Sequence, residues 1–476
     1  MRACGRLAAG FAMAAFALSA RSPRLIKLQV SAVDEKGLPV SDLRPEDIHV
    51  FENGESQPIV FSRHWQDATS ETPHVVTVLL NLLDPAVQPF QWEQTIHALK
   101  RFEAADDLYF YLLTNPSGVL LPVRGLPETA GQAAQPAAGW TDRLIPQLDA
   151  MRSLFRPPLP GSRKGGFDTD LTGAYAAAET LASKMSLLPG PKALVWIGRE
   201  PLFVRSEDWG ASASAHQMDD KMSHLLSVLD RADIRVYTAR LTLPISSTDA
   251  NDVVVRTDER PGLSDATSGR TYLDDIVKAV SQASSDSRQG YRIVYDSQTP
   301  DSVTKYHKIE VKTDRRGVHL YTKRGYDPQM IQDPDPTHRE FAYTMVDALR
   351  EAPDISLRAT VARGARDPNL AHFQVHVDAA DLLLLPDGKS YRGKLSLLFV
   401  SYPKDGRKMV SGDPIPISFN LSREQRDIAL RSGLSFPADV GFDSSIRAVR
   451  VIVCDDLAQS AGSVIIPIAP AREPEH

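Results

Sequence analysis

The sequence predicts an α/β fold in which a doubly wound, mostly parallel sheet is joined to a small N-terminal β unit and a C-terminal all-β sandwich. Three observations support this prediction. Nearly continuous apolar runs alternate with helical patterns between residues 75 and 239, as in a parallel sheet covered on both faces. Apolar and polar residues alternate with period two at 25–32, and short strand patterns recur after residue 355.

The composition is that of a globular chain. Of its 476 residues, 54 are Lys or Arg and 60 are Asp or Glu, which gives a net charge of -6, and 42% are hydrophobic. That apolar share excludes a collagen-like chain and wholesale disorder. Because no long basic run is present, we expect no nucleic-acid partner. At about 150 residues per domain, the length suggests roughly three domains.

The N-terminus has the pattern of a secretory signal peptide, predicted over 1–20. Arg2 and Arg6 precede an uncharged apolar run at 7–20, which is short of the about 20 residues that a membrane-spanning helix needs. A retained anchor or a frayed helix is the alternative. The signal predicts a periplasmic or secreted protein with no membrane insertion of the mature chain. Cys454 would be its only cysteine, so no intramolecular disulfide is expected.

The small β unit is predicted at 24–64, packed on the domain that follows. Residues 25–32 form its first strand, and the polar stretch 34–37 marks a turn. A second strand at 48–52 is followed by Asn53-Gly54, a dipeptide that favours a hairpin turn.

The doubly wound domain is predicted at 70–326. Its buried strands are expected at 75–80, 108–113, 193–197 and 234–239. The helices between and after them are expected at 91–102, 170–185, 217–231 and 272–285. In the last helix, one face would carry Leu273, Ile276, Val277 and Val280. Three short strands at 290–295, 306–311 and 318–321 are expected to extend the edge of the same sheet.

A linker is predicted at 327–340, because three Asp-Pro steps there disfavour helix. The β-sandwich is predicted at 341–470. Its strands are expected at 355–362, 373–377, 395–400, 415–419, 446–453 and 464–468. The polar segment 422–431 is expected to form a short helix that crosses between strands.

The order of these elements resembles the von Willebrand factor type A fold, and several phrases resemble its bacterial branch, the VWFA-related proteins. The phrases are Val33–Val40 with Phe51–Gly54, then Leu188–Ile197, and Tyr306–Val311 with Gly325-Tyr326. The resemblance covers about 24–326 and implies a doubly wound sheet with loops presented at its carboxyl edge.

The resemblance also implies where a metal-ion-dependent adhesion site would lie. In that site the first strand ends in Asp-x-Ser-x-Ser, a later loop supplies Thr, and an Asp follows the central strand, because Mg²⁺ prefers hard oxygen ligands. Here the first strand ends in Asn81-Leu82-Leu83-Asp84-Pro85, and Gly198 takes the place of the last Asp. Thr169 alone matches clearly. We therefore expect a degenerate site with no metal and no cofactor.

Two alternatives remain for the carboxylates near that site. Asp84, Asp168 and Asp170 could converge and hold Ca²⁺ weakly. Alternatively, Asp168 and Thr169 cap the helix that follows, since short oxygen-bearing side chains satisfy its free N–H groups, and Asp84 merely ends a strand.

Motifs for catalysis are absent from the sequence. It contains no Gly-x-Ser-x-Gly elbow, His-Glu-x-x-His motif, phosphate loop or dinucleotide fingerprint. We therefore expect no enzyme, although a site without a known motif is an alternative. Trp196 is expected in the core, whereas Trp140 and Trp209 lie in polar stretches where an aromatic side chain could anchor a partner.

The predicted function is a non-enzymatic, extracytoplasmic, metal-independent module that binds a protein partner of unknown identity. In α/β folds, ligands bind outside the carboxyl ends of the strands. The candidate binding residues in those loops are Asp84, Thr169, Arg199, Glu200, Phe203, Arg205 and Trp209. The alternatives are an envelope scaffold without a discrete ligand and a weakly cation-dependent adhesion protein.

Overall fold

The computed structural model of the chain describes most of its residues. They are 23–66, 74–84, 86–87, 89–103, 107–114, 117–133, 139–142, 146, 166–198, 200, 213–241, 262–299, 306–326, 338–363, 369–441 and 445–468. The predicted signal peptide and most of the predicted linker lie outside this set.

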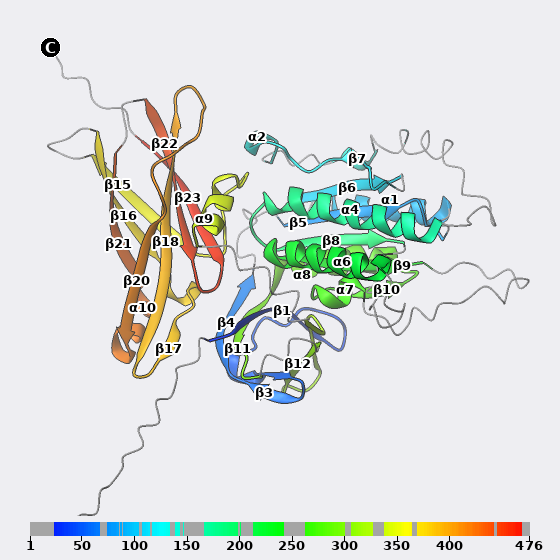
Figure 1. Cartoon of the computed structure of the whole chain (residues 1–476), viewed down its shortest axis with the longest axis horizontal. Coiled ribbons are helices and arrows are strands. Elements are labelled where there is room, and N and C mark those ends of the chain that lie inside the picture. Colours follow the sequence, from blue (N-terminus) through cyan, green and yellow to red (C-terminus); the bar gives the residue numbers. More distant parts are fainter. Residues whose placement is uncertain are drawn as a thin grey trace, which may run out of the picture.

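The protein is a mixed α/β chain built around a mostly parallel sheet of six strands, in the order β10-β9-β8-β5-β6-β7 (Figure 1). Only the edge strand β7 runs antiparallel to its neighbour. The strands of this central sheet are β5 (Val75–Asn81), β6 (Asp107–Leu113), β7 (Leu120–Arg124), β8 (Lys192–Ile197), β9 (Ile234–Arg240) and β10 (Thr271–Leu273).

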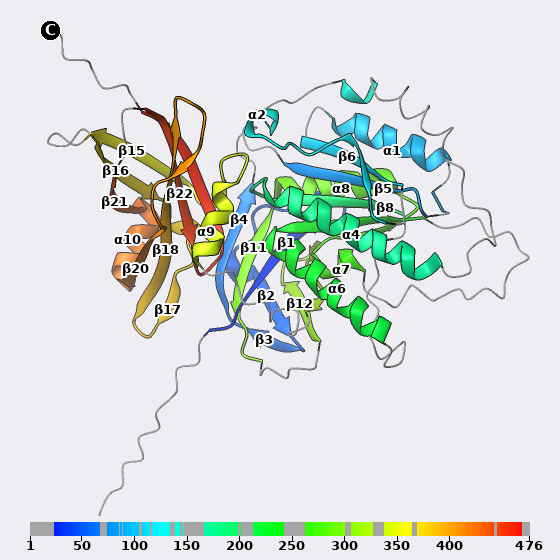
Figure 2. The same cartoon turned by 45° about the horizontal axis from the view of Figure 1, so that its top comes forward.

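Helices cover both faces of the central sheet (Figures 1 and 2). They are α1 (Pro89–Phe102) and α8 (Ile276–Arg288) on one face and α4 (Gly166–Ser186) and α6 (Ala213–Arg231) on the other, with short helices α2 (Ala130–Ala133) and α7 (Leu263–Ala266). Side chains of β8 alternate between the two cores: Leu194 and Trp196 face α4 and α6, whereas Ala193 and Val195 face α1 and α8. All four are fully buried, as expected for a strand covered on both sides.

Two small antiparallel sheets lie beside the central sheet, in the orders β13-β1-β11-β4 and β14-β12-β2-β3. Their strands are β1 (Leu25–Asp34), β2 (Ile48–Glu52), β3 (Glu55–Gln57), β4 (Ile59–Gln66), β11 (Gln289–Asp296), β12 (His307–Thr313), β13 (Val318–Tyr321) and β14 (Gly325–Tyr326), with a 3₁₀ turn η1 (Pro45–Asp47). The alternating apolar residues of β1 and β11 share one core with β2 and β12. We refer to these two sheets as the small sheets.

The pairing of the small sheets corrects one prediction. The strands near 290–321 do not extend the central sheet, because β11 pairs with β1 and β4, and β12 pairs with β2. The physical reason is apolar pairing across a long sequence separation: Leu28 lies opposite Ile293 on the ladder between β1 and β11. Residues 289–326 therefore complete the two sheets that the N-terminal strands begin.

The C-terminal part consists of two antiparallel sheets that share a core. One has the order β15-β16-β21, and in the other β18 pairs with β17, β22, β19 and β20, and β22 with β23. The elements are α9 (His338–Val346), β15 (Leu357–Arg363), β16 (Leu370–Val377), η3 (Ala379–Asp381), β17 (Leu385–Asp387), β18 (Ser390–Pro403), β19 (Met409–Val410), β20 (Ile415–Ser422), α10 (Arg423–Ser432), β21 (Leu434–Gly441), β22 (Ile446–Asp455) and β23 (Ser460–Pro467). Phe373 and Phe399 meet between the sheets, with ring centroids 4.9 Å apart.

The short helix predicted at 422–431 is confirmed as α10. The Ser422 hydroxyl accepts a hydrogen bond from the Gln425 backbone N–H, and the Gln425 side chain accepts one from the backbone N–H of Ser422. Gly433 follows the last turn with a φ of 72°. A glycine adopts this left-handed value without the steric cost that a β-carbon brings.

The helix predicted at 272–285 begins later than expected. Asp275 caps α8, since its carboxylate accepts a hydrogen bond from the Lys278 backbone N–H at 2.8 Å, and the helix starts at Ile276. Leu273 belongs to β10 and is 66% exposed, so it is not on the buried helix face. The apolar spacing that suggested one helix spans a strand and a helix.

The small sheets touch both other parts of the molecule. Gln29 of β1 bonds Arg235 of the central sheet, and the Arg63 Nε of β4 lies 2.9 Å from the Asp381 carboxylate in the C-terminal part. The C-terminal part also contacts the central part directly, because the Leu349 backbone N–H donates to the carbonyl of Leu187, after α4, at 2.8 Å.

Among the described helices, none has both the length and the apolar character needed to cross a bilayer.

Candidate functional site

The carboxyl ends of β5 and β8 meet at one edge of the central sheet, because the two strands are parallel neighbours with Leu80 opposite Ile197. This edge, which we call the carboxyl edge, brings three positions together: Asn81, Asp84 and Gly198. A β-carbon built on Gly198 would lie 3.1 Å from Asp84 Oδ2 and 3.4 Å from the β-carbon of Asn81. The positions that the resemblance pointed to are therefore neighbours.

Both polar residues of the first loop make local turn contacts. Asn81 Oδ1 accepts a hydrogen bond from the Leu83 backbone N–H at 3.1 Å, and Asp84 Oδ1 accepts one from Ala86 at 3.0 Å. Their exposed fractions are 5% and 7%. Contacts two residues ahead are typical of Asx turns, so both side chains shape the loop that follows β5.

Gly198 follows β8 in a conformation that favours glycine. Its φ is +103°, and the space where a side chain would begin is bounded by Asp84 and Asn81. A side chain here would be strained and crowded. The position offers no side-chain oxygen to a cation, and the two loops come close together instead.

Glu200 lies under the carboxyl edge and is not on its rim. Only 2% exposed, its Oε2 accepts hydrogen bonds from the Thr238 hydroxyl at 2.7 Å and the Ser264 N–H at 3.4 Å. Its Oε1 lies 3.6 Å from Arg240. Burial outweighs these contacts and raises the pKa of Glu200 to about 7. Glu200, a predicted binding residue, is therefore buried and does not lie on the exposed surface of the edge.

Gly262 makes room for the Glu200 side chain. A β-carbon at Gly262 would lie 2.2 Å from Glu200 Oε1, too close for any residue other than glycine unless the carboxylate moved. Glu200 thus links the segment after β8 to β9, through Thr238 and Arg240, and to the start of α7. It acts as a tether between three segments of the edge.

The other predicted site residues lie in helix α4 or outside the described residues. Helix α4 begins at Gly166 and not at Asp170, so Asp168 and Thr169 lie within its first turn and do not precede it. This corrects the expectation that they cap the helix from outside. The remaining candidates lie outside the described residues: Arg199, Phe203, Arg205 and Trp209.

Trp140 is not an exposed anchor. It is 6% exposed and packs in the core between the central sheet and helices α1 and α8. The Arg124 guanidinium carbon lies over its ring, 4.9 Å from the ring centroid. Trp196 is fully buried, which confirms its assignment to the core. Polar neighbours in the sequence did not reveal the burial of Trp140, because its contacts come from residues distant along the chain.

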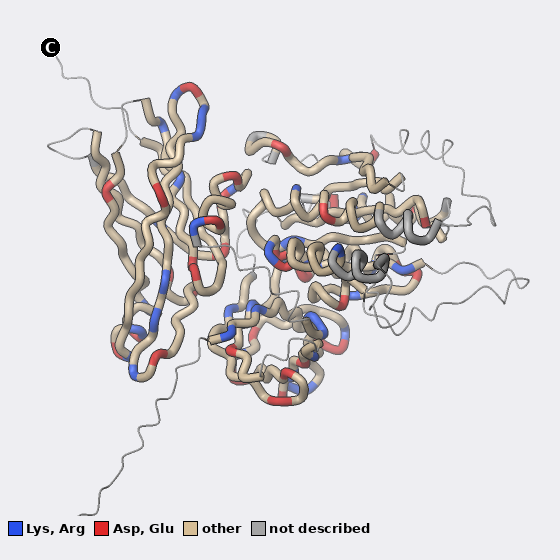
Figure 3. The backbone as a smooth tube through the Cα atoms, in the orientation of Figure 1, with Lys and Arg blue, Asp and Glu red and all other residues tan. Residues whose placement is uncertain are grey.

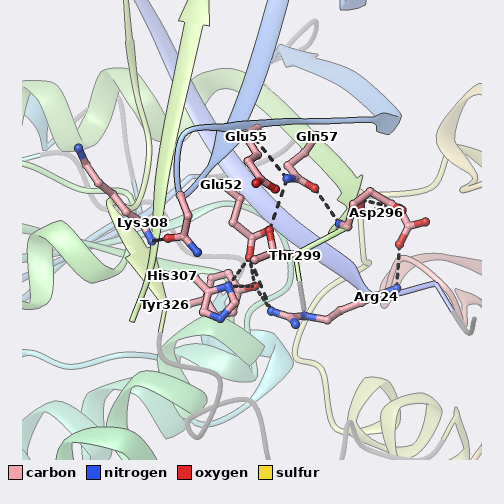
Figure 4. Close-up of polar contacts among 11 residues, drawn as sticks. Arg24, Glu52, Glu55, Gln57, Asp296, Thr299, His307, Lys308 and Tyr326 are labelled. Atoms are coloured by element: carbon pink, nitrogen blue, oxygen red, sulfur yellow. Dashed lines mark hydrogen bonds and ion pairs between the residues drawn. The ribbon is translucent and has the colours of Figure 1, made fainter. Parts of the chain in front are cut away.

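Sequence reasoning also missed a buried polar cluster in the small sheets (Figure 4). Glu52 and His307 are almost fully buried and hydrogen-bonded to each other, and the Tyr326 hydroxyl donates to Glu52 Oε1 at 2.7 Å. The Arg24 guanidinium bonds Tyr326 and lies 3.7 Å from Glu52. Burial opposes ionisation, yet hydrogen bonds from Ser297, Tyr326 and His307 hold the pKa of Glu52 below its usual value. The cluster joins β2, β12 and β14.

Within the described parts of the chain, no three His, Cys, Asp or Glu side chains are grouped as metal ligands would be.

No family model matches the chain, and no curated protein matches it significantly. Among solved structures, the chain is similar at 8% identity and a TM-score of 0.14 to a β-glucosidase from Listeria innocua in complex with gluconolactone. The match covers 85% of this chain and 48% of that one. A score this low carries no argument about fold or activity.

Proposed function

We propose that the chain is a non-enzymatic module that binds a protein partner through the loops of its carboxyl edge, without a metal. One observation carries the proposal. Asp84 and Glu200, the carboxylates beside Gly198 that were expected to be binding residues, are buried in contacts within the protein, and Gly198 supplies no ligand beside them. A surface that fixes its own loops in this way suits contact with another protein better than capture of a cation.

We further propose that the fold is a degenerate von Willebrand factor type A domain of the VWFA-related kind, followed by a β-sandwich. The support is the order of the elements and the place of the resembling phrases. The phrase Leu188–Ile197 contains the central strand β8, and Phe51–Gly54 and Tyr306–Val311 lie on paired strands of the small sheets. The shared core of the two C-terminal sheets supports the sandwich.

The proposed compartment is outside the cytoplasm. It rests on the basic start and the apolar run of residues 1–20. N-terminal sequencing of the purified mature protein tests it: a start near residue 21 is expected, and a start at Met1 would refute it.

The binding proposal is tested by capture of a partner after cross-linking in the native envelope. Arg199→Ala and Trp209→Ala should each weaken capture by about 1 kcal/mol or more and leave the melting temperature unchanged, because the sequence predicts that both residues lie in a loop and loop residues contribute little to the core. Arg316→Ala, an exposed position in the turn between β12 and β13, is the matched control. Equal capture by the Arg199 and Trp209 variants and the control would exclude this edge. Complete absence of a captured partner would favour a scaffold role.

Titration with Mg²⁺, Mn²⁺ and Ca²⁺ separates this proposal from a cation-dependent adhesion protein. A ligand at one hundred times its dissociation constant stabilises the native state by about 2.7 kcal/mol. We expect no such shift in thermal melts. A saturable response that Asp84→Ala abolishes would establish the alternative.

A further inference from the structure

A cleft of about 510 Å³ opens at the opposite, amino-terminal edge of the central sheet. Its walls come from β1, from the C-terminal ends of α4 and α6, from α9, and from the turn between β22 and β23. In Figure 3, basic and acidic segments are interleaved where these helix ends face the small sheets. The volume falls within the range of about 300–1,000 Å³ that small-molecule sites occupy.

The charges of the cleft do not balance. Five basic and four acidic side chains line it. Arg292 donates to Asp233 at 2.8 Å and to Asp354 at 3.2 Å, and Lys323 lies 3.2 Å from Asp230. Asp230, Asp233 and Asp354 are therefore each paired with a basic side chain, and the lining carries one positive charge in excess.

Lys192 is the buried cation of this cleft that has no carboxylate partner. It is the first residue of β8 and shares its face with Leu194 and Trp196, so its side chain lies toward the ends of α4 and α6. It is 5% exposed, and its Nζ donates to the Gly190 carbonyl at 3.0 Å. No carboxylate of the described residues lies within 4.0 Å of that nitrogen.

An ammonium group has three N–H donors, so Lys192 has capacity for further acceptors. Buried charges are normally paired or hydrogen-bonded. In the free protein, the carbonyl ends of α4 and α6 face the same edge and favour its charged form. A negatively charged acceptor on a ligand would supply the further hydrogen bonds that the Lys192 ammonium group can donate.

Most of the remaining lining is apolar. It includes Leu25 of β1, Leu187 and Val228 at the helix ends, and Phe341 and Met345 of α9. These side chains offer no hydrogen bonds to a ligand. Burial of apolar ligand surface against them would stabilise the complex by about 25 cal/mol per Å² of surface removed from water.

We propose that this cleft binds a small amphipathic carboxylate, whose apolar part lies against α9 and the ends of α4 and α6 and whose carboxylate pairs with Lys192 Nζ. The excess positive charge favours an anion, and the apolar walls favour an aliphatic or aromatic body. The site lies at the edge opposite the proposed protein-binding loops, so the two proposals stand independently.

The protonation of Lys192 gives the site a pH signature. Burial lowers the pKa of Lys192 to about 8; Asp233 and Asp354 oppose this shift, and Arg350 and Arg292 add to it. A bound carboxylate favours the ammonium form, so binding near pH 8 takes up a proton. As pH rises above 8 the free lysine loses its proton, and the affinity falls, by about tenfold per pH unit once the pH is well above the pKa.

The test is isothermal calorimetry on the full chain with octanoate, 1-octanol and octylamine as probes of equal chain length. We expect octanoate to bind at least tenfold more tightly than 1-octanol at pH 7, and the octanoate affinity to fall about fivefold from pH 8 to pH 9. Lys192→Met keeps the aliphatic stem and removes the charge, so octanoate should bind it no better than 1-octanol. Lys36→Met, at an exposed turn, is the matched control.

A second variant keeps the test decisive if Lys192→Met does not fold. Thr344 is exposed and lines the cleft on α9, so Thr344→Trp should narrow the site and weaken octanoate and 1-octanol alike without disturbing the core. Absence of octanoate binding to the wild type, tighter binding of octylamine, or affinities unchanged by both variants would each overturn the proposal.

Discussion

At the scale of single residues, the surroundings of a buried carboxylate decide its charge. Glu52 and Glu200 are both almost fully buried, yet their pKa values move in opposite directions. Around Glu52, hydrogen bonds from Ser297, Tyr326 and His307 outweigh burial. Around Glu200, burial outweighs the contacts with Thr238 and Arg240. Glu52 is therefore held in its ionised form, whereas Glu200 loses its proton only near pH 7.

Glu200 gives the protein a pH-dependent stability. Its folded-state pKa of about 7 lies above the ordinary value of 4.5, so the native state binds more protons than the unfolded state between these values. The contribution is fully present below pH 4.5 and is lost as pH rises through 7, with a total of about 3 kcal/mol. Urea unfolding from pH 4 to 8 should show this loss in the wild type and a flatter profile in Glu200→Gln.

The control for that experiment is Glu46→Gln, because the Glu46 side chain is 68% exposed. Its pH profile should follow the wild type. If Glu200→Gln also follows the wild type, then Glu200 does not titrate in this range and its role as a neutral tether is refuted.

Gly198 allows a second test at this scale. At a φ of +103° and with Asp84 Oδ2 3.1 Å from a built β-carbon, Gly198→Ala adds both strain and crowding. Gly37 has a φ of +78° and nothing within 4 Å, so Gly37→Ala adds strain alone. Left-handed backbone costs a non-glycine residue about 1–2 kcal/mol. Chemical unfolding should show a larger loss for Gly198→Ala, and equal losses would mean that the two loops are not tightly packed.

At the scale of elements, sequence patterns predicted where strands and helices lie better than they predicted which strands pair. The buried runs at 75–80 and 193–197 became β5 and β8, because a run of β-branched apolar residues carries its own signal. The partners of β11 and β12 were not predictable, since pairing across more than two hundred residues leaves no local trace. The burial of Trp140 was missed for the same reason, because its packing neighbours are distant along the chain.

The Glu52 and His307 contact is expected to hold β2 against β12. Removing one partner of this buried hydrogen bond costs about 1–3 kcal/mol or more, because the other partner stays buried without it. His307→Phe and Glu52→Leu should therefore each be strongly destabilising, and the double variant should lose less than the sum of the two. Measured by urea unfolding, this coupling should reach about 1 kcal/mol or more.

The exposed pair of His49 and Asp314, also between β2 and the end of β12, is the matched control. Its side chains are 41% and 86% exposed, so His49→Phe should change stability by less than about 1 kcal/mol. Strict additivity of the Glu52 and His307 variants would show that their contact does not join the strands.

At the scale of the whole molecule, the small sheets act as the junction between the other two parts. Apolar side chains of β4 and β11, among them Phe61 and Val294, pack against Leu383 and Leu385 of the C-terminal part. Beside them, Arg63 binds the Asp354 carbonyl and the Asp381 carboxylate, and Arg292 binds the Asp354 carboxylate. The sequence predicted separate domains but not this interface, because no pattern within one segment reports what packs on its outer face. The cleft that Lys192 lines exists only because these parts meet.

This junction predicts how the protein behaves after cleavage between its predicted domains. Limited proteolysis is expected to cut within 327–340, and the fragments should stay together on size exclusion, since the apolar contacts and both arginines lie outside that segment.

Replacing both arginines, Arg63→Met with Arg292→Met, leaves buried carboxylates without their partners, a change that costs about 2–5 kcal/mol at an interface. The nicked double variant should then separate at micromolar concentration. Arg407→Met, which removes an exposed ion pair with Asp405, should not separate them. Co-elution of the nicked double variant would mean that the apolar contacts alone hold the parts together, and cleavage inside the central or C-terminal sheets before 327–340 would refute the predicted boundary.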